Sequence, residues 1–170
     1  MILQHREFVA QENVLEQMAD KSPPTGATYL GSAACAECHK QDYEVWQNSK
    51  HGHAWDTLVR VEKDPKRYGW PVTKYPDCVS CHTTGFGKPG GFITPEKTPQ
   101  LLNVGCERCH GPGSEHVASL GQKKLGKVGD GLPATTCTQC HDFEQSPKFQ
   151  YTNMWQAIQH GAKAVVPKKK

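Results

Sequence analysis

One short pattern occurs four times in this chain and limits what the chain can fold into. All eight cysteines fall in pairs with two residues between them, and a histidine follows each pair directly. With nine histidines in 170 residues, four such coincidences would arise by chance in about one chain in a hundred thousand. The pentapeptides are CAECH at 35–39 (motif 1), CVSCH at 78–82 (motif 2), CERCH at 106–110 (motif 3) and CTQCH at 137–141 (motif 4).

Three kinds of site use paired cysteines. Disulfides would explain the even number of cysteines but not the histidines. Zinc held by four thiolates would explain the two-residue spacing, but it needs no histidine after each pair. Covalent attachment of c-type haem uses the whole pentapeptide, because two thiols bond to the porphyrin edge while the histidine coordinates the iron. On a helical turn these three side chains share one face. The motifs therefore predict four covalent haem c groups.

The composition favours a core that the polypeptide does not build alone. Hydrophobic residues make up 36% of the chain, which also has 16 glycines and 12 prolines. Such a chain forms many turns and loops and is marginally stable by itself. We therefore expect a mainly α, loop-rich multihaem cytochrome c with a haem-built core and little or no β-sheet.

The positive charge of the polypeptide gives little information about its partners. The formal charge is +3, but each ferric haem with two propionates and two neutral histidines adds about −1. The assembled protein is therefore close to −1 when oxidised, by this rough count. The run of three lysines at 168–170 is typical of a solvated tail. We expect no nucleic-acid partner, and no apolar run is long enough to cross a membrane.

The sequence divides into an N-terminal arm with a linker, residues 1–26, and a tetrahaem domain, residues 27–170. The arm has a weakly amphipathic stripe over residues 7–18 and ends in the breaker KSPPTG. In the domain, Ser32 is the expected N-cap of a helix that runs through Cys35 to about Trp46. Gly161 is the expected C-cap of a helix in TNMWQAIQHG.

The histidines supply the axial ligands of the irons. Histidine or methionine can fill the second axial position, but the chain has three methionines, of which Met1 is terminal and Met154 lies in an apolar helical context. Bis-histidine coordination is therefore expected, and it implies relatively low reduction potentials because Met/His ligation raises them. The proximal ligands are His39, His82, His110 and His141, and the remaining histidines are His5, His51, His53, His116 and His160.

Two of the remaining histidines lie two residues apart in the stretch QNSKHGHAW. Residues with this spacing point in roughly opposite directions in a strand, and about 200° apart in a helix. His51 and His53 are therefore not expected to bind one iron. If His51 is a ligand, His53 faces elsewhere, where it hydrogen-bonds a propionate or completes the second haem.

The motifs and their flanking residues resemble the tetrahaem cytochrome c-554 family. The resemblance covers about residues 29–161 and is carried by CAECHKQDYEVWQNSKHGHAW, DCVSCHTTGFGKPGGF, VGCERCHGPGSEH and CTQCH. It implies distal ligands: His116 for the haem of motif 1, His51 for that of motif 3 and His160 for that of motif 4. The family's namesake lacks a strong sixth ligand at its second haem, which leaves His53 and His5 as candidates at motif 2.

The resemblance implies electron transfer between redox partner proteins, and we expect no enzymatic activity. One alternative is a polymeric extracellular cytochrome filament, assembled as a homo-oligomer through the arm that carries His5. Another is a small enzyme that converts nitrogen oxides or hydroxylamine at an open second haem. Covalent haem attachment takes place outside the cytoplasmic membrane, so we expect a periplasmic or extracellular location, although no signal peptide is visible in the chain.

The motif count predicts the mass of the intact protein. Under denaturing conditions, mass spectrometry should give the mass of the polypeptide plus four haem groups, because thioether bonds survive unfolding. A thiol-alkylating reagent should add no further mass, since all eight sulfurs are bonded. Fewer than four additions would contradict the prediction, and peptide mapping would identify the vacant motif.

Overall fold

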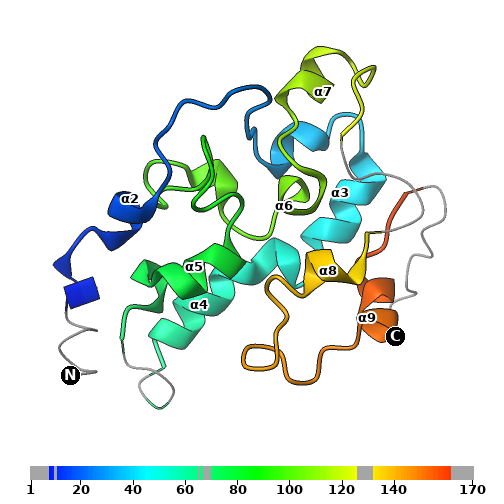
Figure 1. Ribbon diagram of the computed structural model, residues 1–170. Helices are drawn as coiled ribbons and strands as arrows, with labels where there is room; N and C mark the ends of the chain where they lie inside the picture. Colours follow the sequence, from blue (N-terminus) through cyan, green and yellow to red (C-terminus); the bar gives the residue numbers. More distant parts are fainter. Residues whose placement is uncertain (1–7, 10, 65, 67–69, 126–131, 162–170) are drawn as a thin grey trace.

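The computed structural model describes residues 8–9, 11–64, 66, 70–125 and 132–161. These residues form short helices joined by long loops (Figure 1). The β pairing among them is one isolated antiparallel bridge between Thr83 and Leu102. The expected mainly α, loop-rich fold with little or no β-sheet is thereby confirmed. Within the described ranges, no helix combines the length and apolar character that a membrane crossing requires.

The longest described helix, α4, has nine residues. Isolated helices of this length are marginal in water, so contacts with other groups must hold them. The α-helices are α2 (Val14–Met18), α3 (Lys40–Gln47), α4 (Ala54–Glu62), α5 (Pro76–His82), α6 (Cys106–His110), α7 (Ser114–Ala118), α8 (Ala134–Cys137) and α9 (Tyr151–Met154). The 3-10 turns are η1 (Ser32–Cys35), η2 (His51–His53), η3 (Val72–Lys74), η4 (Pro99–Leu101) and η5 (Trp155–Ala157).

The apolar core lies where α4 and α5 run side by side (Figure 1) and contact η3. The rings of Trp55 and Phe92 pack in it with centroids 5.8 Å apart. Val79, inside motif 2, is fully buried. The core therefore builds the surroundings of motif 2 from protein side chains. Its buried members are Leu15, Trp55, Leu58, Val72, Val79, Phe92 and Leu101.

The described part of the N-terminal arm packs on its own chain. Leu15 of α2 is 5% exposed and belongs to the apolar core. The neighbouring Glu16 forms an ion pair with Lys97, which lies in the loop that leads to η4. These contacts attach α2 to the haem domain, whereas His5 lies outside the described residues.

The other half of the molecule buries almost no side chain. No residue of α3, α7, α8 or α9 is buried, and neither is any described residue in 114–161. Leu120 and Phe143 are 90% and 86% exposed. Burial this sparse does not offset the conformational entropy lost on ordering these helices. This half therefore has the form expected if large apolar groups, bound to the motifs, supply its core.

A buried carboxylate ties the start of the haem domain to motif 3. Glu107 is 3% exposed, and its oxygens accept hydrogen bonds from the backbone N–H groups of Leu30 (3.0 Å), Gly31 (2.7 Å) and Gly113 (2.7 Å). Gly31 has φ +89°, and a Cβ atom there would lie 2.6 Å from the carbonyl oxygen of Gln100. Glycine is therefore required where the chain passes this carboxylate.

The expected helix from Ser32 to Trp46 is wrong in its bounds. The chain forms η1 at Ser32–Cys35, and α3 begins only at Lys40. The Ser32 hydroxyl does accept a backbone N–H, but from Cys106 at the start of α6 (3.1 Å). The Ser32 hydroxyl thus caps α6, which is distant in sequence, and not a helix that starts at Ser32 itself. The expected helix before Gly161 is also shorter, since α9 ends at Met154 and η5 follows it.

Replacing Glu107 with Gln should lower the free energy of unfolding by about 2–4 kcal/mol. The amide NH₂ would face backbone donors that now share two charged acceptor oxygens. Glu115→Gln is the matched control, because its side chain is 49% exposed and pairs with Lys123 at 3.2 Å. That change should cost less than about 1 kcal/mol. Urea unfolding followed by far-ultraviolet circular dichroism measures both, and equal losses would contradict the role of Glu107.

Candidate functional site

Each motif forms one helical turn. Motif 2 lies within α5 and motif 3 spans α6. In motif 1 the turn is closed by a backbone hydrogen bond of 2.9 Å from the N–H of His39 to the carbonyl of Cys35. In motif 4 the N–H of His141 donates to the carbonyl of Cys137 over the same distance. All eight cysteines are described, and none of them forms a disulfide. In the described ranges, no group of three or more His, Cys, Asp or Glu residues could hold a metal ion by itself.

Three of the four motif histidines face a second histidine ring. A metal–imidazole bond is about 2 Å long, and a ring nitrogen lies about 1 Å from its ring centre, so two imidazoles on one ion have centroids about 6 Å apart. Each observed pair therefore has room for one iron. The pairs are His39 and His116 (6.1 Å, planes at 29°), His141 and His51 (6.1 Å, 43°), and His110 and His160 (5.7 Å, 63°).

Hydrogen bonds at Nδ1 orient several of these rings. A ring whose Nδ1–H donates to a carbonyl keeps the lone pair of Nε2 for a metal. His141 has its Nδ1 2.9 Å from the Ser146 hydroxyl. The donor set and its orientation therefore fit haem. The carbonyl acceptors are Ala54 for His82 (2.6 Å), Lys123 for His116 (2.7 Å) and Ile158 for His160 (2.8 Å).

The resemblance implied a different pairing for two histidines. It placed His51 at motif 3 and His160 at motif 4, but in the structure their rings face His141 of motif 4 and His110 of motif 3. The partner of His116 is the one that the resemblance implied. The exchange has a structural reason, because the N–H of Gly161 donates to Asp42 in α3 at 2.9 Å. This contact draws the segment with His160 away from the motif that precedes it in sequence.

Motif 2 differs from the other three motifs. In the part of the chain that the structure describes, no histidine ring faces that of His82. The candidate His53 has its Nδ1 3.0 Å from Asp56 Oδ2, and its side chain is 60% exposed. Thus His53 is paired with a carboxylate of α4, the helix that follows it directly, and is not brought to His82. The other candidate, His5, is outside the described residues.

Contacts between motifs fix their order in space. The thiols of Cys35 in motif 1 and Cys106 in motif 3 lie close enough to shift each other's pKa. Arg108 links motif 3 to motif 4, since its Nη2 donates to Cys140 Sγ at 3.5 Å. The Cys140 thiol in turn lies close enough to that of Cys81 in motif 2 for each to shift the other's pKa. The motifs therefore follow one another in the order 1, 3, 4, 2.

The thiol contacts shift the acidity of both partners. The hydrogen bond from Cys35 lowers the pKa of Cys106 to about 6, and the same bond raises the pKa of Cys35. The contact with Cys81, followed by the charge of Arg108, lowers the pKa of Cys140 to about 6.

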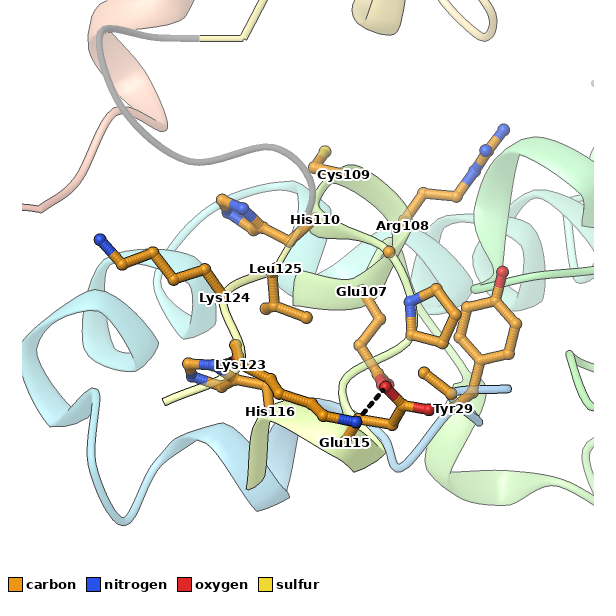
Figure 2. Close-up of a pocket in the computed structure, with 13 residues that line it drawn as sticks. Tyr29, Glu107, Arg108, Cys109, His110, Glu115, His116, Lys123, Lys124 and Leu125 are labelled. Carbon is orange, nitrogen blue, oxygen red and sulfur yellow. Dashed lines mark hydrogen bonds and ion pairs between the residues drawn. The ribbon is translucent and has the colours of Figure 1, made fainter. Parts of the chain in front are cut away.

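A cavity of about 430 Å³ opens between α6 and α7. Figure 2 shows His110 and His116 on its walls, with Leu125 between them and Tyr29 on the opposite side. The volume is in the range of pockets that enclose a large organic ligand. The cavity thus lies beside His116, whose ring faces His39 of motif 1, and beside His110 of motif 3.

The sequence interpretation missed two residues of this site, Glu107 and Arg108. They are the spacer residues of motif 3, which is the one motif with two charged spacers. That pattern was a usable signal, because an attachment motif needs only its cysteines and histidine. Two charges in the spacer therefore indicate partners elsewhere in the fold, here the backbone near Leu30 and the thiol of Cys140.

Comparisons with known proteins agree with this chemistry. Residues 34–111 match the family model described as cytochrome c554 and c-prime. Cytochrome c-554 of Nitrosomonas europaea is 35% identical over 143 residues, which are 71% of this chain and 61% of that protein. The chain thus spans less than two thirds of the length of this relative. The solved structure of reduced cytochrome c554 from the same organism matches with a TM-score of 0.54 and 25% identity, over 76% of this chain and 82% of that one. The chain is thus similar to the cytochrome c-554 family in sequence and in fold.

Proposed function

We propose that the chain is a tetrahaem c-type cytochrome that transfers electrons between redox partner proteins and converts no substrate. The observation that carries this proposal is the set of three facing histidine pairs, each joining a motif histidine to a histidine from another segment. When bound, haem supplies reversible one-electron chemistry at its iron. The chain supplies the axial ligands, the apolar surroundings and the order of the sites.

Each residue type of the site has a separate role. The motif cysteines hold the groups through thioether bonds: Cys35, Cys38, Cys78, Cys81, Cys106, Cys109, Cys137 and Cys140. The proximal ligands are His39, His82, His110 and His141. The distal ligands are His116 for motif 1, His160 for motif 3 and His51 for motif 4, as the ring pairs support.

The hydrogen bonds at Nδ1 support low reduction potentials. A histidine ligand that donates its second N–H to a carbonyl is held in one orientation and is a more basic ligand. Basic bis-histidine ligation favours the ferric state, in contrast to Met/His ligation. Ala54 and Lys123 supply such carbonyls to a proximal and a distal histidine.

The order 1, 3, 4, 2 supports one continuous path. Thiols bond to the porphyrin edge, so thiols that touch bring the edges of two groups together, where electron exchange is fast. Cys35 and Cys106 would join motifs 1 and 3, and Cys140 and Cys81 would join motifs 4 and 2. Motifs 1 and 2 are the ends of this path, so redox partners would exchange electrons there.

A small enzyme is the second candidate, because no ring faces His82 among the described residues. An open position at that iron could accept a nitrogen oxide or hydroxylamine. Electron paramagnetic resonance of the oxidised protein tests this candidate, since an enzyme of this kind requires a high-spin ferric signal from one haem in four, and an entirely low-spin protein would exclude it. The filament alternative has no support from the described part of the arm, where α2 packs on its own chain.

We also infer a location outside the cytoplasmic membrane, in the periplasm or beyond it, because covalent haem attachment takes place there. Fractionation of the native host, followed by haem staining of denaturing gels, tests this inference directly. Thioether bonds keep the stain with the polypeptide during denaturation. Recovery of the stained chain in the cytoplasmic fraction would contradict it.

Replacing His51 with Ala should leave four haems attached and convert one of them to the high-spin state. The thioether bonds do not depend on the distal side, and an iron without its second imidazole becomes high-spin. His53→Ala is the matched control two residues away, and its spectrum should be the same as that of the wild type. Electron paramagnetic resonance of the ferric proteins provides the measurement.

The double variant His51→Ala with His160→Ala tests the pairing further. Two high-spin haems are expected, because the two histidines serve different irons. Added imidazole should restore the low-spin state of both. An unchanged spectrum in His51→Ala, or a loss of low-spin signal in His53→Ala alone, would show that the ring pairs do not report the ligands.

A further inference from the structure

Arg108 occupies the junction between motifs 3 and 4. Its Nη2 donates to Cys140 Sγ at 3.5 Å, and its Nη1 donates to the side-chain oxygen of Gln139 at 3.4 Å. Figure 2 shows the side chain leading away from the cavity and from the carboxylate of Glu107. One residue of motif 3 therefore reaches both a spacer residue and an attachment sulfur of motif 4.

The positive charge of Arg108 is not cancelled by an acidic side chain in the described part of the chain. Both contacts are made with groups that are neutral once Cys140 is bonded as a thioether. The adjacent carboxylate of Glu107 is turned to the backbone N–H groups of Leu30 and Gly31. The Nε of Arg108 is buried and has no hydrogen-bond partner among the described residues. A guanidinium remains charged at any accessible pH, and a charge held in this way is costly unless a nearby negative charge offsets it.

We propose that Arg108 raises the reduction potential of the haems at the junction of motifs 3 and 4. This inference rests on the proposed electron-transfer function. Reduction adds one electron, and so one negative charge, at each of these sites, and a fixed positive charge nearby favours the reduced form. The effect is strongest where protein atoms exclude water, because the effective dielectric constant is low there. The junction is the middle of the path 1, 3, 4, 2. Because its haems would have the raised potentials, electrons that enter at either end would be held preferentially at motifs 3 and 4.

Arg108→Gln removes the charge and tests the proposal. Potentiometric titration with electron paramagnetic resonance should show a decrease in the reduction equilibrium constant of a junction haem by about tenfold, which is 59 mV for a one-electron couple. The signals lost in His160→Ala and His51→Ala identify the haems of motifs 3 and 4. Arg108→Lys keeps the charge and should change the constant by less than about threefold. Arg60→Gln is the matched control, because Arg60 is exposed on α4 and its charge is screened by solvent.

Gln139→Glu provides a second test that leaves Arg108 in place. Position 139 is exposed, and a carboxylate there would neutralise the guanidinium and lower the same potentials. If Arg108→Gln fails to keep all four haems, its potentials cannot be compared with those of the wild type, and the Gln139→Glu variant alone tests the proposal. Unchanged potentials in Gln139→Glu, equal shifts in Arg108→Lys and Arg108→Gln, or an equal shift in Arg60→Gln would overturn the proposal. All these results require four attached haems, whereas a wild-type protein with fewer haems would contradict the proposed function itself.

Discussion

The structure depends on the helical turn that each motif forms, because this turn sets two thiols and one imidazole at fixed positions. The described helices reach nine residues at most, and those that surround motifs 1 and 4 bury no side chain. Helices of this kind need an external template. The facing ring pairs, which join distant segments such as those of His39 and His116, show where such a template would hold the chain.

The molecule combines two ways of building a core. Around motif 2, apolar side chains of α2, α4, α5 and η3 pack together, and Val79 within the motif is fully buried. Across residues 114–161, the described part has no buried side chain. The first half can thus gain stability from the hydrophobic effect in the ordinary way. The second half relies instead on long-range contacts such as that between Gly161 and Asp42.

The sequence predicted the local features of the site better than its long-range ones. The helical turn of each motif and the mainly α, loop-rich fold follow from short spacings and composition, and both are found. In the structure the rings of His51 and His160 lie beside the motif histidines in exchanged order, His141 and His110, because their placement depends on how loops carry distant segments past one another. The same reason explains Ser32, which caps α6 and not its own helix, and Arg108, whose partner Cys140 lies 32 residues further along the chain.

The order of the motifs in space differs from their order along the chain, and this difference bears on how the protein is made. Motif 4 is the last to be synthesised, yet it stands between motif 3 and motif 2, through Arg108 on one side and Cys81 on the other. A polypeptide that ends before residue 137 would lack the contact of Arg108 with Cys140 and that of Cys140 with Cys81. The proposed path between the two ends of the molecule is therefore completed only by the final motif, so an unfinished chain carries no current from one partner to the other.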